Sequence, residues 1–164
     1  MRRRKPDPAA EAAPDDPRAA RLAALKLLNR RDYGARELAE RLVVRGFTRA
    51  AADTAIAGLA AERLVDDARF AEHFVAYHAN RGQGPVRIAH RLREAGVAAP
   101  TIDATVDANA ADWRRRCEQV RRKRFGARPP ASWAERGRQA RFLTQRGFSA
   151  DQVRAAVGGD APEE

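Results

Sequence analysis

An eleven-residue block that recurs three times constrains the fold of this chain more than any other feature. It occupies residues 37–47 (ELAERLVVRGF), 87–97 (RIAHRLREAGV) and 138–148 (RQARFLTQRGF). Each copy carries a glycine at its tenth position, and these glycines, 50 and 51 residues apart, are Gly46, Gly96 and Gly147. Repeats at a fixed period of this length are typical of arrays of one supersecondary unit. We therefore expect three similar units in tandem.

The apolar spacing of the first unit predicts three helices. In a first helix, Leu22, Leu25 and Leu28 would share one apolar stripe, with Ala24 and Leu27 beside it. Within the block, Leu38 and Leu42 are spaced i, i+4, and Gly46 is placed to end the second helix. Thr48 is the expected N-cap of the third helix.

The second and third units repeat this order. Ile88 and Leu92 occupy the leucine positions of the block, and Pro85 suits the first turn of a helix. In the third unit Ser149 is the expected N-cap of the last helix, while Gln139 stands where the other copies carry leucine or isoleucine. No segment shows the alternation of a strand. The predicted fold class is all-α, with three tandem three-helix repeats that resemble helix-turn-helix units.

Composition and breaks in the pattern set the expected domain boundaries. Hydrophobic residues make up 44% of the chain but aromatic residues only 6%, which favours several small cores over one large one. We expect a disordered, basic and proline-rich arm, three repeats, and a disordered acidic tail. Their predicted ranges are 1–17, 18–65, 66–106, 107–157 and 158–164.

The formal net charge of +10 is concentrated in the last repeat. Residues 66–111 carry a net charge of −1, whereas residues 112–157 hold thirteen basic and four acidic residues, a net charge of +9. Only three of the 32 basic residues are lysine, as a GC-rich genome would produce, but such a bias does not explain the clustering. The asymmetry indicates a polyanion or an acidic protein surface as the partner of the last repeat.

Residues 114–116 and 121–124 are the densest basic runs, and on one helix they lie about two turns apart. Backbone phosphates would bind such a face through counterion release, with strong salt dependence. A plain solvated helix face explains the same runs equally well. No motif for reading bases is present in the sequence.

The sequence contains no constellation typical of an enzyme, and we expect neither metal nor cofactor. His73, His78 and His90 lack the spacing of zinc ligands, and the single cysteine, Cys117, fits a partly buried helical position. The pair Asp66-Asp67 is typical of a helix start, and residues 82–85 (GQGP) of a turn. No stretch of about 18 apolar residues exists, so we expect no membrane span and a cytoplasmic location.

An aromatic stripe lies in the middle repeat. Phe70, Phe74 and Tyr77 follow one another at i, i+4 and i+7. Packing in the core is the expected role of such a stripe. The alternative is that Tyr77 or His78 faces outward to a partner.

The middle repeat resembles the RecX family of regulatory proteins. The resemblance is carried by residues 65–75 (VDDARFAEHFV) and 81–96 (RGQGPVRIAHRLREAG), together with the flanking copies of the block, and it covers about residues 20–157. It implies three tandem three-helix repeats in an elongated, curved array. It also implies binding to the RecA recombinase, within the groove of its filament on single-stranded DNA. Family members generally inhibit RecA, some bind DNA directly, and no catalysis is associated with the family.

We therefore expect a monomeric regulator that binds RecA filaments and inhibits their ATPase, recombination and SOS-related activity. The residues expected to contact the partner or DNA are Arg87, Arg91, Arg121, Arg122 and Arg124. The alternative is a stand-alone DNA-binding regulator built of helix-turn-helix-like units. That alternative predicts tight, salt-sensitive binding to duplex DNA with a sequence preference.

Overall fold

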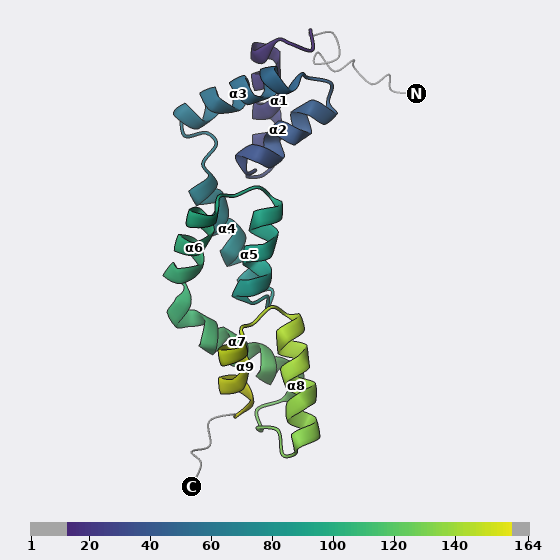
Figure 1. Cartoon of the computed structure of the whole chain (residues 1–164), viewed down its shortest axis with the longest axis vertical. Helices are drawn as coiled ribbons and strands as arrows, with labels where there is room; N and C mark the ends of the chain where they lie inside the picture. Colours follow the sequence, from purple (N-terminus) through teal and green to yellow (C-terminus); the bar gives the residue numbers. More distant parts are fainter. Residues whose placement is uncertain (1–12, 159–164) are drawn as a thin grey trace, which may run out of the picture. The chain divides into compact units, whose positions relative to one another are not determined.

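The computed structural model describes residues 13–158, which form nine α-helices and no strand (Figure 1). The helices are α1 (Pro17–Leu28), α2 (Ala35–Val44), α3 (Arg49–Ala61), α4 (Asp67–Asn80), α5 (Pro85–Glu94), α6 (Ala99–Ala108), α7 (Ala110–Phe125), α8 (Trp133–Gln145) and α9 (Ala150–Val157). They follow one another in three groups of three, which confirms the predicted all-α class and the three three-helix repeats.

The described chain divides into two compact units. Unit 1 contains the residues up to Phe70 together with Ala95–Val97, and unit 2 contains Ala71–Glu94 and the residues from Ala98 onward. The elongated, curved arrangement of the repeats stays a prediction. Most of the predicted N-terminal arm and acidic tail lie outside the described residues.

The first described residues lead directly into the first helix. Helix α1 starts at Pro17, with Asp16 as its N-cap. The carbonyl of Pro14 accepts a hydrogen bond of 2.7 Å from the backbone N–H of Thr48, which ties this segment to the start of α3. Proline suits a first helical turn because its missing N–H has no partner there in any case.

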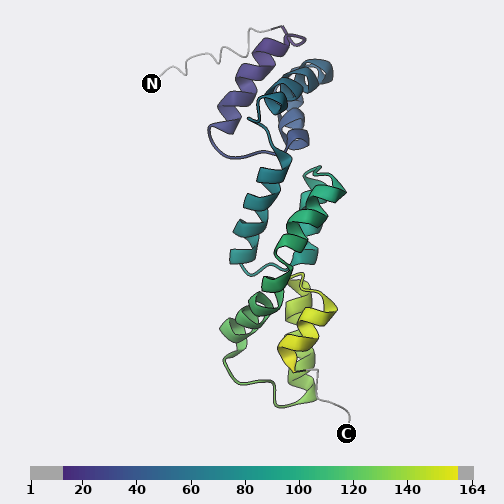
Figure 2. The ribbon, with the colours of Figure 1, turned by 90° about the vertical axis from the view of Figure 1, so that its left-hand side faces the viewer.

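Three alanines and one leucine form the buried face of α1. Of the predicted stripe, Leu22 is 63% exposed and Leu25 and Leu28 are partly buried, while the neighbouring Ala24 and Leu27 are buried. The buried residues of the helix are Ala20, Ala23, Ala24 and Leu27. Helix α1 packs against α3 (Figure 2), whose buried face is also rich in alanine. Small side chains at the contact let two helices approach closely.

The predicted helix caps are confirmed. The Thr48 hydroxyl accepts a hydrogen bond of 3.3 Å from the backbone N–H of Ala51. Ser149 and Gln152 form a capping box at the start of α9. A carboxylate oxygen of Asp66 accepts from two backbone N–H groups at the start of α4, at 2.9 and 3.0 Å. These bonds satisfy N–H groups that a helix start otherwise leaves without partners.

The three block glycines all adopt the left-handed conformation that ends a helix. Their φ angles are +98° at Gly46, +84° at Gly96 and +89° at Gly147. Within unit 2, the turn at Gly147 covers the start of α5: the N–H of Gly84 donates to the carbonyl of Arg146 at 2.8 Å, and that of Val86 donates to the carbonyl of Gly147 at 3.0 Å. The turn between α8 and α9 therefore caps α5 and joins two repeats within one unit.

Helices α6 and α7 meet at a single residue, Asn109. The indole N–H of Trp113, which is fully buried, donates to the carbonyl of Val106 at 3.1 Å and closes this junction. Helix α7 then packs on α8 and α9. Over the residues described, none of the helices has the length and apolar character needed to cross a membrane.

Candidate functional site

Unit 2 contains a groove of about 470 Å³ between the end of α4, one face of α7 and the second half of α8. Its lining residues are Ala79, Asn80, Arg81, Gly82, Arg116, Gln119, Val120, Lys123, Arg124, Phe142 and Arg146. Five of these side chains are cationic, and none of the described residues that line the groove is acidic. The groove therefore has the chemistry of an anion-binding site.

Helical spacing places the α7 residues of the groove on one face. Arg116, Val120 and Lys123 are separated by four and three residues, so they lie above one another along the helix. The guanidinium of Arg116 donates to the side-chain oxygen of Asn80 at 3.1 Å, which fixes it against the end of α4. Gly82, with φ of +75°, lets the turn after α4 approach Val120, since a Cβ at this position would lie 3.0 Å from a methyl group.

None of the groove cations forms an ion pair among residues 13–158, so no neighbouring carboxylate offsets their positive charge. Two other cations on α7 do form ion pairs. Arg115 pairs with Asp112 at 2.7 Å, and Arg122 pairs with Glu118 at 3.6 Å. The same helix thus presents a paired face and an unpaired face, and the unpaired face lines the groove.

Aromatic rings accompany the groove cations. The guanidinium of Arg81 lies 4.0 Å from the ring centre of Tyr77, and that of Arg146 lies 5.2 Å from the ring centre of Phe142. Phe142 and Phe125 meet edge to face with ring centres 5.4 Å apart. Guanidinium groups at these distances are attracted by the face of an aromatic ring.

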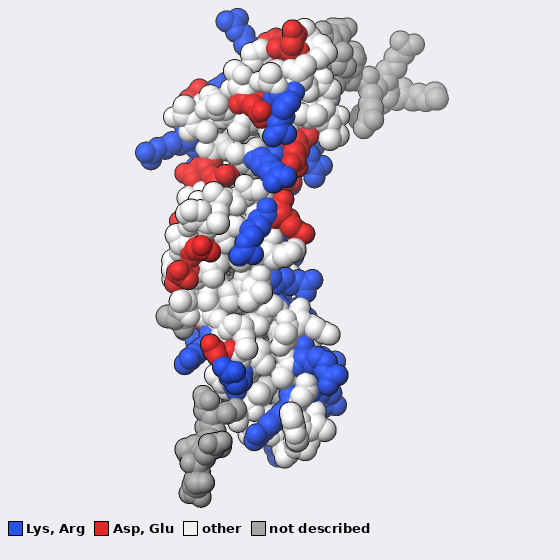
Figure 3. Space-filling model, viewed as in Figure 1, with Lys and Arg blue, Asp and Glu red and all other residues white. Residues whose placement is uncertain are grey.

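A second hollow of about 410 Å³ adjoins the groove at Phe142 and is lined by α8 alone, through Arg138, Arg141, Phe142 and Gln145. Figure 3 shows lysine and arginine side chains gathered along α8 on the face in view. Basic residues therefore extend from the groove along α8.

Models of the three RecX domains match this chain in order. The first three-helix domain matches residues 20–59, the second matches residues 66–106 and the third matches residues 113–157. This chain belongs to the RecX family. The groove accordingly lies in a unit that holds most of the second RecX domain and all of the third.

Relatives cover nearly the whole chain. Regulatory protein RecX of Halorhodospira halophila is 50% identical over 139 residues, which cover 85% of this chain and 86% of that protein. Regulatory protein RecX of Ectopseudomonas mendocina is 38% identical over 145 residues, which cover 88% of this chain and 97% of that protein. The crystal structure of RecX from Lactobacillus salivarius shares the fold, with a TM-score of 0.76 at 18% identity over 88% of this chain and 96% of that one.

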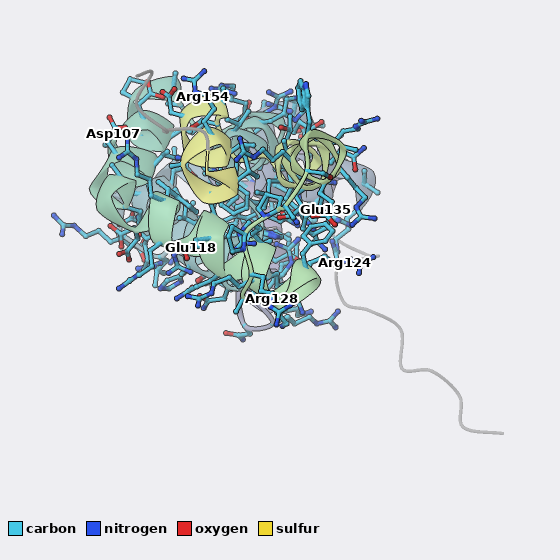
Figure 4. The ribbon with its side chains drawn as sticks, turned by 90° about the horizontal axis from the view of Figure 1, so that it is seen from below. Asp107, Glu118, Arg124, Arg128, Glu135 and Arg154 are labelled. Atoms are coloured by element: carbon cyan, nitrogen blue, oxygen red, sulfur yellow. The ribbon has the colours of Figure 1, made fainter. Side chains whose placement is uncertain are left out.

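Of the five arginines predicted to contact a partner, Arg124 alone lines the groove. Arg122 points to the paired face of α7, beside Glu118. Figure 4 shows Glu118, Arg124 and Arg128 on one side of unit 2 and Arg154, on α9, on the other. Arg122 pairs with Glu118, Arg124 lines the groove and Arg121 is buried, so the basic run at residues 121–124 is not one binding surface.

The two predicted arginines of α5 bind within the unit. Arg87 is exposed, but its guanidinium donates to the carbonyl of Gln145 at 3.0 Å. Arg91 is half-buried, 3.1 Å from His78 Nδ1, and lies over the Phe74 ring. Both side chains hold helices together in this RecX chain, and their contact with a partner stays a prediction.

Arg121 is only 4% exposed, so it does not belong to the basic surface where the sequence placed it. Its guanidinium donates to the carbonyl of Arg128 at 3.0 Å and is 3.5 Å from the side-chain oxygen of Gln139. Within the described residues its Nε has no hydrogen-bond partner. Since buried charges need local partners, we assign Arg121 to the core and not to a binding surface.

The five arginines chosen from the sequence leave out four groove cations: Arg81, Arg116, Lys123 and Arg146. Two of the four, Arg116 and Lys123, belong to the basic runs at 114–116 and 121–124. Helical periodicity alone could have found two of them, because Arg116, Lys123 and Arg124 are spaced i, i+7, i+8. Arg81 and Arg146 reach the groove only through the packing of α4 and α8 against α7, which no local pattern reveals.

The aromatic stripe of the middle repeat has both a buried and an outward-facing member. Phe70 is buried, Tyr77 is 52% exposed and faces outward, and His78 is 7% exposed. Burial, and then the charge of Arg91, lower the pKa of His78, which favours the neutral imidazole.

The single cysteine lies buried on α7, outside the groove. Burial raises the pKa of Cys117 to about 12, so its thiol stays protonated. Across residues 13–158, no three His, Cys, Asp or Glu side chains group closely enough to hold a metal ion.

Proposed function

We propose that this RecX-family chain binds the RecA recombinase and its filament on single-stranded DNA, and inhibits the ATPase, recombination and SOS-related activity of that filament. The observation that carries the proposal is the ordered match of all three RecX domains over residues 20–157. The relatives that cover most of the chain are named regulatory proteins. In this proposal the chain acts as a monomer in the cytoplasm and has no catalytic activity of its own.

The basic groove supports a role in contact with the filament. A RecA filament on DNA carries phosphates, and unpaired arginine and lysine side chains in a concave surface favour such a partner. The groove residues replace the run at 121–124 as the proposed contact, with Lys123 and Arg124 shared between the two sets.

The DNA-dependent ATPase of RecA tests this proposal. We expect the protein to lower the ATPase rate at a stoichiometric ratio to RecA. A double variant, Lys123→Gln with Arg124→Gln, should need a several-fold higher concentration to lower the ATPase rate by the same amount. The matched control, Arg115→Gln with Arg122→Gln, removes two charges from the same helix and should act like the unmodified protein.

An unchanged ATPase rate at stoichiometric ratios would contradict the proposal. The same protein would then be tested on duplex DNA without RecA, where binding with a sequence preference would support a stand-alone DNA-binding regulator.

A further inference from the structure

We propose that the groove of unit 2 binds the phosphate backbone of one single nucleic-acid strand, and that the Tyr77–Arg81 stack at its rim holds a base. The inference rests on the proposed function, because it names the chemistry that the groove would meet on a nucleoprotein filament. Binding to a bare strand is nevertheless a property of this chain alone and can be measured without RecA.

The charge of the groove favours phosphate. Four of its five cations are arginines, whose planar guanidinium matches two oxygens of a phosphate at once. None of the five is neutralised by an acidic residue within the described chain, whereas Arg115 and Arg122 on the same helix are. Binding a polyanion in the groove therefore breaks no existing ion pair.

The shape of the groove favours one strand over a duplex. Proteins that read duplex DNA insert a helix or a ribbon into a groove of the DNA. Here the protein supplies the concave surface, with a volume of about 470 Å³, and its α7 wall runs from Arg116 to Arg124. Eight residues of helix span about 12 Å, a length that suits a few nucleotides of a thin, flexible chain.

The rim supplies a surface for stacking. Tyr77 is 52% exposed, and Arg81, which lines the groove, lies over its ring at 4.0 Å. Aromatic rings and guanidinium planes are the surfaces on which unpaired bases stack in single-strand binding proteins. A carboxylate-rich peptide would meet the cations equally well but would gain nothing from Tyr77.

Fluorescence anisotropy of a labelled oligothymidylate, titrated with the full chain at several salt concentrations, tests the groove. The variant Lys123→Gln with Arg124→Gln should weaken binding at least tenfold at low salt. It should also reduce the slope of log K against log salt by about 1.4, since each phosphate contact on a single strand contributes about 0.7. The control Arg115→Gln with Arg122→Gln should leave the slope unchanged.

The role of Tyr77 is tested with two ligands, the oligothymidylate and inorganic polyphosphate, which carries the charge without bases. Tyr77→Ala should weaken binding of the oligothymidylate about tenfold and leave polyphosphate binding unchanged. Tyr77→Phe keeps the ring and should bind both ligands as the unmodified protein does.

Three results would overturn the inference: equal loss of binding in the groove variant and its control, equal effects of Tyr77→Ala on both ligands, or tighter binding of a matched duplex. Displacement of the oligothymidylate by a polyglutamate peptide of equal charge, with no effect of Tyr77→Ala, would assign the groove to an acidic protein instead. Inhibition of RecA that persists in any of these cases would leave the proposed function intact and reject only the groove.

Discussion

Arg121 and Gln139 place a polar contact in the core of the third repeat, where the other repeats are apolar. Gln139 is 4% exposed and occupies the block position of Leu38 and Ile88, both fully buried. The contact with Arg121, together with the carbonyl of Arg128, gives the amide and the guanidinium partners inside the unit. Gln139 thus departs from the repeat pattern of the sequence, and Arg121 supplies a polar partner for it in the core.

This pairing predicts non-additive stability changes. Arg121→Leu or Gln139→Leu alone should each lower the free energy of unfolding by about 2 kcal/mol, because each leaves the other buried polar group short of a partner. The double variant restores the apolar pattern of the first two repeats and should lie within about 1 kcal/mol of the unmodified protein. Urea unfolding of all four proteins measures the coupling. Two additive losses would show that the side chains do not act as a pair.

The turn that follows the second helix of each repeat has one conformation in three different surroundings. Space around Gly46 is open, with no heavy atom within 4 Å of a Cβ added there. The same atom at Gly96 would meet the side chain of Arg36, at the start of α2 in unit 1. At Gly147 it would meet Arg87, with the backbone nitrogen of that residue 2.7 Å away. The glycine therefore ends a helix in every copy and also permits close packing in two of them.

Alanine substitutions separate these two roles. Gly46→Ala should lower the free energy of unfolding by about 1 kcal/mol, because a side chain at positive φ is strained. Gly147→Ala has the same strain and also collides with the start of α5, so it should lower the free energy of unfolding by about 3 kcal/mol. Thermal unfolding of the two variants measures the difference. Equal losses of stability would mean that the contact between the Gly147 turn and α5 is dispensable.

Local signals predicted the helices well and the side-chain environment less well. The caps at Thr48 and Ser149 and the block glycines are read directly from residue types with a fixed backbone role. The stripe of Leu22, Leu25 and Leu28 does not show that Leu22 is exposed, because the neighbouring alanines allow a closer contact with α3 than leucine would. The groove could be predicted only in part, since it depends on how α4 and α8 pack against α7.

At the scale of the whole molecule, the positive charge of the third repeat and the membership of the RecX family both support the proposed contact with a nucleoprotein filament. The third repeat carries most of the net charge of +10, and the structure sorts the cations at residues 115–124 into paired, buried and groove-lining sets. This sorting explains why the densest basic run in the sequence is not a single binding surface. Substitution of Lys123 and Arg124 on α7 is therefore the change most specific to the groove.

Cosedimentation with RecA filaments assembled on single-stranded DNA tests the central proposal most directly. We expect the protein to pellet with the filaments and to saturate at a fixed ratio to RecA, well above its pelleting with the same DNA alone. The variant Lys123→Gln with Arg124→Gln should pellet less than the control Arg115→Gln with Arg122→Gln. Pelleting no greater with filaments than with bare DNA would contradict the account.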